Sequence, residues 1–171
     1  MGAGEGALVA LHFAGNQAKL HGLTALSVIA DSFLCKYDGR ALHRLLNIRE
    51  HYYVRHAGEL QQQHGDSWRQ IVDADTAFLR GVADRGGYEL PDFVMNSIAC
   101  PVLLTGNLRD AVTPGISQEF ARASAIIPDC SVYLTSKSGH RYGDEHPFMW
   151  TAPTLFRAIS DLFLSRVMGN Q

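Results

Sequence analysis

The sequence predicts an α/β protein in which a three-stranded parallel sheet is flanked by helices. Two observations carry this prediction. Three apolar, β-branched runs of strand length lie along the chain, and segments with helical periodicity separate and follow them. The runs are residues 23–30, 101–105 and 131–135. Because the carboxyl ends of parallel strands meet at one edge of a sheet, polar residues in the loops at that edge are the candidates for chemistry.

The first half of the chain supplies a helix, a strand and a helical insertion. Residues 7–14 are apolar on every side, which favours a buried helix, and glycines at positions 2, 4 and 6 precede it as a tight turn. Residues 23–30 follow as a strand that ends at Asp31. Amphipathic helical spacing then runs from Asp38 to about Gly87, and Gly86, Gly87 and Pro91 close this segment. We therefore predict a single domain over residues 1–171 with a helical insertion at 36–96.

The second half returns to alternating strands and helices. The strand at 101–105 leads into a turn that contains Asp110, and a helix with an apolar face is expected from 116 to 127. The strand at 131–135 is followed by a loop with two histidines, His140 and His146. A final amphipathic helix carries Pro153 in its first turn, a position that proline favours.

The composition limits the classes of function. With 46% hydrophobic and 19% charged residues, the chain suits one globular core. The formal charge of −2 without a basic block makes nucleic acid an improbable partner. No window holds the roughly 18 apolar residues of a membrane span. Three widely spaced cysteines predict a reducing, cytoplasmic setting without disulfides, and nothing in the sequence calls for a metal or cofactor.

The chemistry-bearing residues resemble those of the α/β-hydrolase superfamily. The string from Gly2 to Gly6, GAGEG, resembles the G-x-S-x-G nucleophile elbow, and the apolar helix follows it. Asp110, at the end of CPVLLTGNLRD, resembles the triad acid, and His140, at the end of SVYLTSKSGH, resembles the triad histidine. The order nucleophile, acid, histidine is that of the family.

This resemblance implies a partial α/β-hydrolase fold. It covers the whole chain but corresponds to the C-terminal half of the family fold, from the nucleophile elbow onward. The insertion at 36–96 lies where the family carries a helical cap or lid. The implied activity is that of a serine esterase, thioesterase or amidase acting on small acyl compounds.

The nucleophile position departs from the family pattern, because Gly4 stands where the family has serine. Glycine has no side chain that can attack a carbonyl carbon, so we expect an inactive or strongly impaired hydrolase, a pseudoenzyme with a triad remnant. The backbone N–H of Glu5 is the expected oxyanion donor. The family's second donor comes from a loop before the elbow, so the chain is expected to be a truncated form, a mis-started reading frame or an altered version.

Two choices about single residues stay open. His140 follows the last strand immediately and is preferred as the triad histidine, with His146 as the alternative because its spacing to the final helix also matches the family. A metal site formed by His140, Asp144, Glu145 and His146 is a weak alternative. Cys35 as a substitute nucleophile is weaker still, because buried cysteines are usually inert.

The expected partners follow from the edge of the sheet. The strand at 23–30 should leave an apolar edge unpaired, which favours association. We expect a homodimer or an N-terminal partner fragment at this edge, together with a small acyl substrate or ligand. Two alternative functions remain: a noncatalytic small-molecule-binding module, in which Gly4 makes room for a ligand, or one half of a two-chain hydrolase.

Overall fold

The structure is a computed structural model that describes residues 1–17, 25–136 and 146–169. The chain divides into two units, which we call unit 1 (Met1–Cys35 and Leu90–Gln171) and unit 2 (Lys36–Glu89). The polypeptide leaves unit 1 after Cys35 and returns at Leu90. The N–H of Leu90 donates a 2.7 Å hydrogen bond to the carbonyl of Cys35, so the two crossing points are neighbours.

Unit 1 contains a parallel sheet with the strand order β1-β2-β5-β6. The two central strands pair from Val28 opposite Val102 to Asp31 opposite Thr105. The predicted parallel α/β architecture is thus confirmed. The sheet has one strand more than predicted, because two residues that we expected within a turn pair with β2. The expectation that the strand at 23–30 has an unpaired edge is therefore wrong at Ala30 and Asp31, where β1 pairs with it. The strands are β1 (Gly2–Ala3), β2 (Val28–Asp31), β5 (Val102–Asn107) and β6 (Cys130–Thr135).

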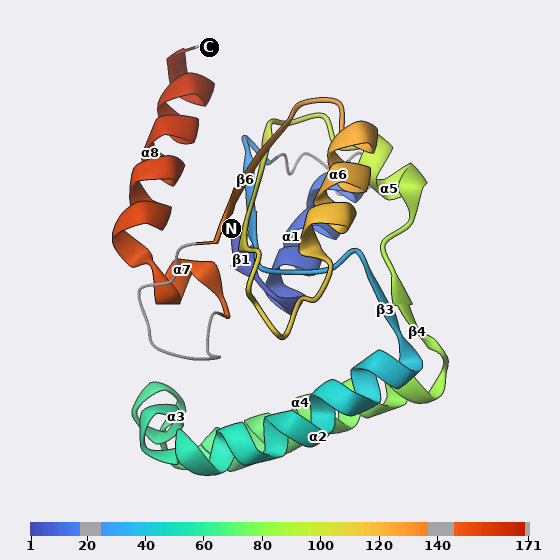
Figure 1. Cartoon of the computed structure of the whole chain (residues 1–171), viewed down its shortest axis with the longest axis vertical. Helices are drawn as coiled ribbons and strands as arrows, with labels where there is room; N and C mark the ends of the chain where they lie inside the picture. The colour runs from blue at the N-terminus through green and yellow to red at the C-terminus, as the bar shows by residue number, and fades with distance from the viewer. Residues whose placement is uncertain (18–24, 137–145, 170–171) are drawn as a thin grey trace. The chain divides into compact units, whose positions relative to one another are not determined.

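Helices cover both faces of this sheet, as Figure 1 shows. One face carries α1 (Glu5–Asn16), α5 (Asp92–Asn96) and α6 (Ile116–Ile126). The other carries α7 (Phe148–Thr151) and α8 (Pro153–Gly169). Burial of apolar side chains between the sheet and its two helical layers is the main stabilising contribution to this arrangement.

Each helical layer has its own apolar contacts. Ile29 and Leu103, which are in register on neighbouring strands, pack with residues of α7 and α8 in one cluster that includes Phe148, Phe156, Phe163 and Val167. On the opposite face, the rings of Phe33 and Phe120 lie 5.1 Å apart between centroids, and both are buried. The central strands β2 and β5 are therefore buried on both sides, in agreement with their continuous apolar sequences, whereas β6 is only partly buried.

Unit 2 is a two-stranded antiparallel ribbon that continues into helices. The ribbon pairs β3 (Lys36–Asp38) with β4 (Gly87–Glu89). Its helical part packs α2 against α4 through buried Leu42, Leu46, Val72, Leu79 and Ala83. The helical elements are α2 (Gly39–Arg55), α3 (Ala57–His64), the 3₁₀ turn η2 (Gly65–Ser67) and α4 (Trp68–Asp84).

The boundary of unit 2 differs from that of the predicted insertion. We expected the insertion to extend to residue 96, but unit 2 ends at Glu89. The helix α5 instead packs on α1 and α6 of unit 1, where Val94 and Met95 are buried. Within the described ranges, every helix falls short of the combined length and hydropathy that a membrane crossing requires.

Candidate active site

Gly4 occupies a sharp turn between β1 and α1. Its backbone has φ +55° and ψ −124°, a left-handed conformation that favours glycine. Two backbone hydrogen bonds hold the turn: the N–H of Gly4 donates to the carbonyl of Asp31 at 3.0 Å, and the N–H of Ala7 donates to the carbonyl of Gly4 at 3.1 Å. The turn therefore fixes residue 4 at the carboxyl end of the sheet without any contribution from a side chain.

Asp110 lies in the turn that follows β5. Its N–H donates to the carbonyl of Asn107 at 3.2 Å, and its Oδ1 accepts a 2.8 Å hydrogen bond from the N–H of Val112. The side chain is fully buried. The Asn107 side chain supports the same turn by accepting a 2.9 Å hydrogen bond from the N–H of Arg109. The carboxylate is thus held in one orientation with its Oδ2 available to a second donor.

His146 completes the contact between these elements. Its Nδ1 lies 2.7 Å from Asp110 Oδ2, and because a carboxylate only accepts, Nδ1 carries the proton. The Nε2 atom faces the elbow: a Cβ built on Gly4 would lie 3.7 Å from it, and Nε2 is the one heavy atom of the described residues outside the turn within 4 Å. The histidine side chain is 24% exposed. Gly4, Asp110 and His146 therefore meet at one edge of the sheet.

The end of β2 anchors the segment that follows His146. Ser32 Oγ accepts a 2.8 Å hydrogen bond from the N–H of Phe148, and Asp31 Oδ2 accepts one of 3.0 Å from the N–H of Met149. Thr105 Oγ1 donates a further 2.6 Å bond to Asp31 Oδ1. The side chains of Asp31 and Ser32 were not among the predicted site residues. The sequence signal for this anchor is Asp31, an acidic residue at the carboxyl end of a buried strand.

Burial raises the pKa of the Asp31 carboxyl above its ordinary value of 3.8. The hydrogen bonds from Thr105, Met149 and Ser32 and the nearby His146 act in the opposite direction, but the loss of hydration outweighs them. The site therefore has two buried carboxyl groups: that of Asp110 bonds the imidazole itself, and that of Asp31 bonds the backbone beyond it.

The remaining predicted site residues divide into two groups. Glu5 is the first residue of α1, and the N–H groups in the first turn of a helix lack partners within that helix. His140, Asp144 and Glu145 lie outside the described residues. Within the described ranges, no group of three or more potential metal ligands comes together.

Comparison with solved structures identifies the fold. The chain matches NosK from Streptomyces actuosus with a TM-score of 0.67 and 16% identity, covering 95% of this chain and 66% of NosK. It also matches MGS-M2, an α/β-hydrolase enzyme from a Medee basin deep-sea metagenome library, with a TM-score of 0.59 and 14% identity, covering 96% of this chain and 63% of that one. The chain has a partial α/β-hydrolase fold.

A third neighbour extends the comparison to an esterase. The match to the Pyrococcus furiosus esterase Pf2001 has a TM-score of 0.57 and 17% identity, and covers 96% of this chain and 51% of the esterase. The chain thus spans about half to two thirds of the length of the α/β-hydrolase structures that it matches. No protein-family model and no curated protein sequence matches the chain.

The cysteines of this α/β-hydrolase fold are poorly suited to replace the nucleophile. Cys35 is completely buried, and burial raises the pKa of its thiol to about 12. Burial likewise raises the pKa of Cys130 to about 11. Since the thiolate is the reactive form, both thiols are almost entirely protonated and unreactive near neutral pH.

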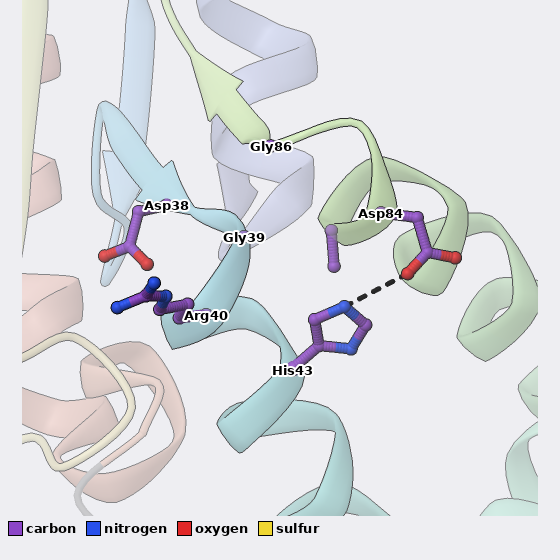
Figure 2. Close-up of a pocket in the computed structure, with 7 residues that line it drawn as sticks. Asp38, Gly39, Arg40, His43, Asp84 and Gly86 are labelled. Carbon is purple, nitrogen blue, oxygen red and sulfur yellow. Dashed lines mark ion pairs between the residues drawn. The ribbon is translucent and has the colours of Figure 1, made fainter.

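An open hollow of about 500 Å³ lies in unit 2 rather than at Gly4 (Figure 2). It is lined by residues from the ends of α2 and α4, and the ion pair between His43 Nε2 and Asp84 Oδ1, 3.1 Å long, borders it. The His43 and Asp84 side chains are 46% and 64% exposed, so the pair contributes little to stability. Gly4, Asp110 and His146 lie together in unit 1 instead.

Proposed function

We propose that this chain binds small acyl compounds at an α/β-hydrolase-type site in which Asp110 and His146 are the acid and the base of a triad without its serine. The observation that carries the proposal is the alignment of three groups. Asp110 bonds Nδ1 of His146, and Nε2 of the same ring faces the turn at Gly4. In a serine triad the acid orients the imidazole and the imidazole takes the proton of the nucleophile.

We assign the base role to His146 rather than to His140. The support is the 2.7 Å contact with Asp110 and the anchoring of the following residues by Ser32 and Asp31. An imidazole that a carboxylate bonds, in a backbone segment that is itself anchored, keeps one tautomer and one orientation, as general-base catalysis requires. The Glu5 N–H at the start of α1 is the proposed oxyanion donor, because helix N-termini carry partial positive charge.

With glycine at position 4, the chain is proposed to lack serine-dependent acyl transfer. Loss of the nucleophile lowers the rate of such enzymes by several orders of magnitude. The geometry of the turn suggests that the missing group can be restored. A hydrogen bond of about 2.8 Å from a hydroxyl on residue 4 to Nε2 is compatible with the 3.7 Å separation between the added Cβ and that nitrogen.

The test is Gly4→Ser, with Gly4→Ala as the matched control. Both variants place a Cβ at the left-handed turn, but only serine supplies a hydroxyl. We expect Gly4→Ser to react with a fluorophosphonate probe and to show a burst of p-nitrophenolate from p-nitrophenyl butyrate, whereas Gly4→Ala does neither. A folded Gly4→Ser protein that resists the probe would argue against the proposal, and stabilisation by small ligands without reaction would support the binding-module alternative.

We further propose that another polypeptide segment covers the outer edge of β1. Within the described part of the chain, β1 pairs on one side only. Near this edge, an open hollow is lined by Met1, Val9, Phe13 and Val28. Met1 and Val9 are at least two-thirds exposed, and so is Leu26, which lies between the lining residues Ala25 and Ser27 in the sequence. Uncovered apolar edges promote pairing with a further strand, and the matched structures contain additional chain.

Sedimentation velocity distinguishes the possible occupants of this edge. The proposal predicts that a peptide with an apolar strand sequence binds the chain, and that Val9→Lys and Leu26→Lys weaken the binding. Phe93→Lys, on the exposed side of α5, is the control, because Phe93 is similarly exposed but distant in sequence from β1. A dimer that Val9→Lys dissociates would assign the edge to a second copy, and a monomer without peptide binding would contradict the proposal.

A further inference from the structure

We propose that the chain hydrolyses activated esters directly, with a water molecule beside Gly4 as the nucleophile and the Asp110–His146 pair as its general base. The inference rests on the proposed acyl-binding site and gives that site an activity that needs no serine. It starts from the space at residue 4. Among the described residues, a Cβ added to Gly4 meets no heavy atom closer than 3.7 Å, and the atom at that distance is His146 Nε2.

The nitrogen that faces this space is an acceptor. Because Nδ1 carries the proton that Asp110 Oδ2 accepts, Nε2 of the neutral ring has its lone pair directed away from the carboxylate. A water molecule in the position of the absent side chain can therefore donate to Nε2. A second donor, the Glu5 N–H, belongs to the residue directly after Gly4, at the start of α1. The base and an electrostatic stabiliser thus flank the same position.

The proposed reaction is balanced without a covalent intermediate. The water oxygen bonds to the acyl carbon while one of its protons passes to His146 Nε2, and the carbonyl oxygen becomes an oxyanion near the Glu5 N–H. The tetrahedral intermediate then re-forms its carbonyl, the bond to the leaving oxygen or sulfur breaks, and that atom takes the proton from Nε2. The products are a carboxylic acid and an alcohol, phenol or thiol. Asp110 stabilises the imidazolium that exists between the two proton transfers.

The same geometry indicates the class of substrate. A single assigned oxyanion donor stabilises the intermediate weakly, so a good leaving group such as a phenolate or thiolate is required. The carboxyl groups of Asp31 and Asp110 are buried at the site, and Glu5 follows Gly4 directly. Like charges repel in such surroundings, so a neutral acyl group is favoured over an anionic one. The predicted substrates are neutral, short aryl esters and thioesters.

The experiment measures hydrolysis of p-nitrophenyl acetate by the unmodified chain, His146→Gln, Asp110→Asn, Gly4→Ala and Gly4→Ser. We expect slow turnover by the unmodified chain, with no burst and no fluorophosphonate labelling. His146→Gln should lower the protein-dependent rate at least about tenfold, because general-base catalysis typically contributes 10² to 10⁴. Gly4→Ala should lower it similarly, since its methyl group displaces the water. Gly4→Ser bears the same backbone strain as Gly4→Ala. If Gly4→Ser is folded and labelled by the probe, that strain does not explain the loss of activity in Gly4→Ala.

The leaving group provides a second readout. Direct attack predicts that turnover by the unmodified chain falls from p-nitrophenyl acetate to phenyl acetate, whereas an acyl-enzyme route limited by deacylation gives equal rates. A turnover that His146→Gln leaves unchanged, or a burst from the unmodified chain, overturns the inference. An unmodified chain without turnover also overturns it, and labelling of Gly4→Ser then shows that the proposed function still stands. If Gly4→Ser is also folded and unlabelled, both proposals fail.

Discussion

The hydroxyl of Ser32 accepts a hydrogen bond of 2.8 Å from the N–H of Phe148, a residue 116 positions later in the chain. Both residues are buried. Ser32→Ala removes the acceptor and leaves a buried N–H without it, so we expect the free energy of unfolding to fall by about 1–3 kcal/mol. Urea denaturation measures the change. Ser165→Ala is the control, because this hydroxyl bonds within an exposed part of α8 and its loss should change stability by less than about 0.5 kcal/mol.

The raised pKa of Asp31 predicts a pH dependence of stability. Because the folded state holds the proton of this carboxyl more tightly than the unfolded state, it binds more protons between pH 3.8 and the raised pKa. The contribution of Asp31 is therefore most favourable at low pH and decreases as pH rises through this window. We expect the free energy of unfolding of the unmodified chain, relative to that of Asp31→Asn, to decrease as the pH rises through this window. Ser32→Ala disturbs the same anchor but keeps the carboxyl, so it should retain the dependence.

All three cysteines should react slowly until the protein unfolds. The thiol pKa values of about 12 for Cys35 and about 11 for Cys130 keep both groups protonated at pH 8. Alkylation by iodoacetamide should be slow in buffer and fast for all three cysteines in guanidinium chloride, as mass spectrometry can record. Cys130 is the less buried of this pair and should react first. Rapid labelling of Cys35 in the folded protein would contradict its assignment as an inert core residue.

The two outer glycines of the elbow should respond in opposite ways to alanine. A Cβ on Gly2 would overlap the carbonyl oxygen of Gly6, a backbone atom, so we expect Gly2→Ala to cost about 1–3 kcal/mol. Gly6 itself is exposed at the start of α1 with nothing within 4 Å of an added Cβ. Gly6→Ala should therefore leave stability unchanged or raise it by up to about 1 kcal/mol. Thermal unfolding of both variants distinguishes the two roles.

Much of the fold could be predicted because periodicity and burial coincide. The predicted strand at 131–135 corresponds to β6 from Cys130, and the predicted helix at 116–127 corresponds to α6, which ends at Ile126. The pairing of Gly2–Ala3 could not be predicted, since a two-residue strand has no pattern of its own and depends on Ala30 and Asp31. The predicted insertion extends to residue 96, but the packing of α5 on α1 decides that this helix belongs to unit 1, and no local pattern shows that contact.

In the candidate site, too, local sequence predicts some residues, and long-range contacts decide the others. Asp110 could be chosen from its place after a buried strand, and the glycine turn from its spacing before an apolar helix. The choice between two histidines in one loop could not be made in this way. The position of His146 depends on the docking of the residues after it, and that docking uses Ser32 and Asp31, which are more than a hundred positions away. Long-range partners of this kind leave no periodic signal in the sequence.

The hydrogen bond between Cys35 and Leu90 has a consequence for the evolution of this chain. The residues before and after an inserted segment can lie next to each other and share a hydrogen bond, as Cys35 and Leu90 do. Such a segment can be lengthened, shortened or replaced with little disturbance to the strands on either side. Unit 2 is therefore a segment that can be exchanged as a whole. Replacement of the stretch between Cys35 and Leu90 therefore changes unit 2 and leaves the sheet edge with Gly4, Asp110 and His146 as it is.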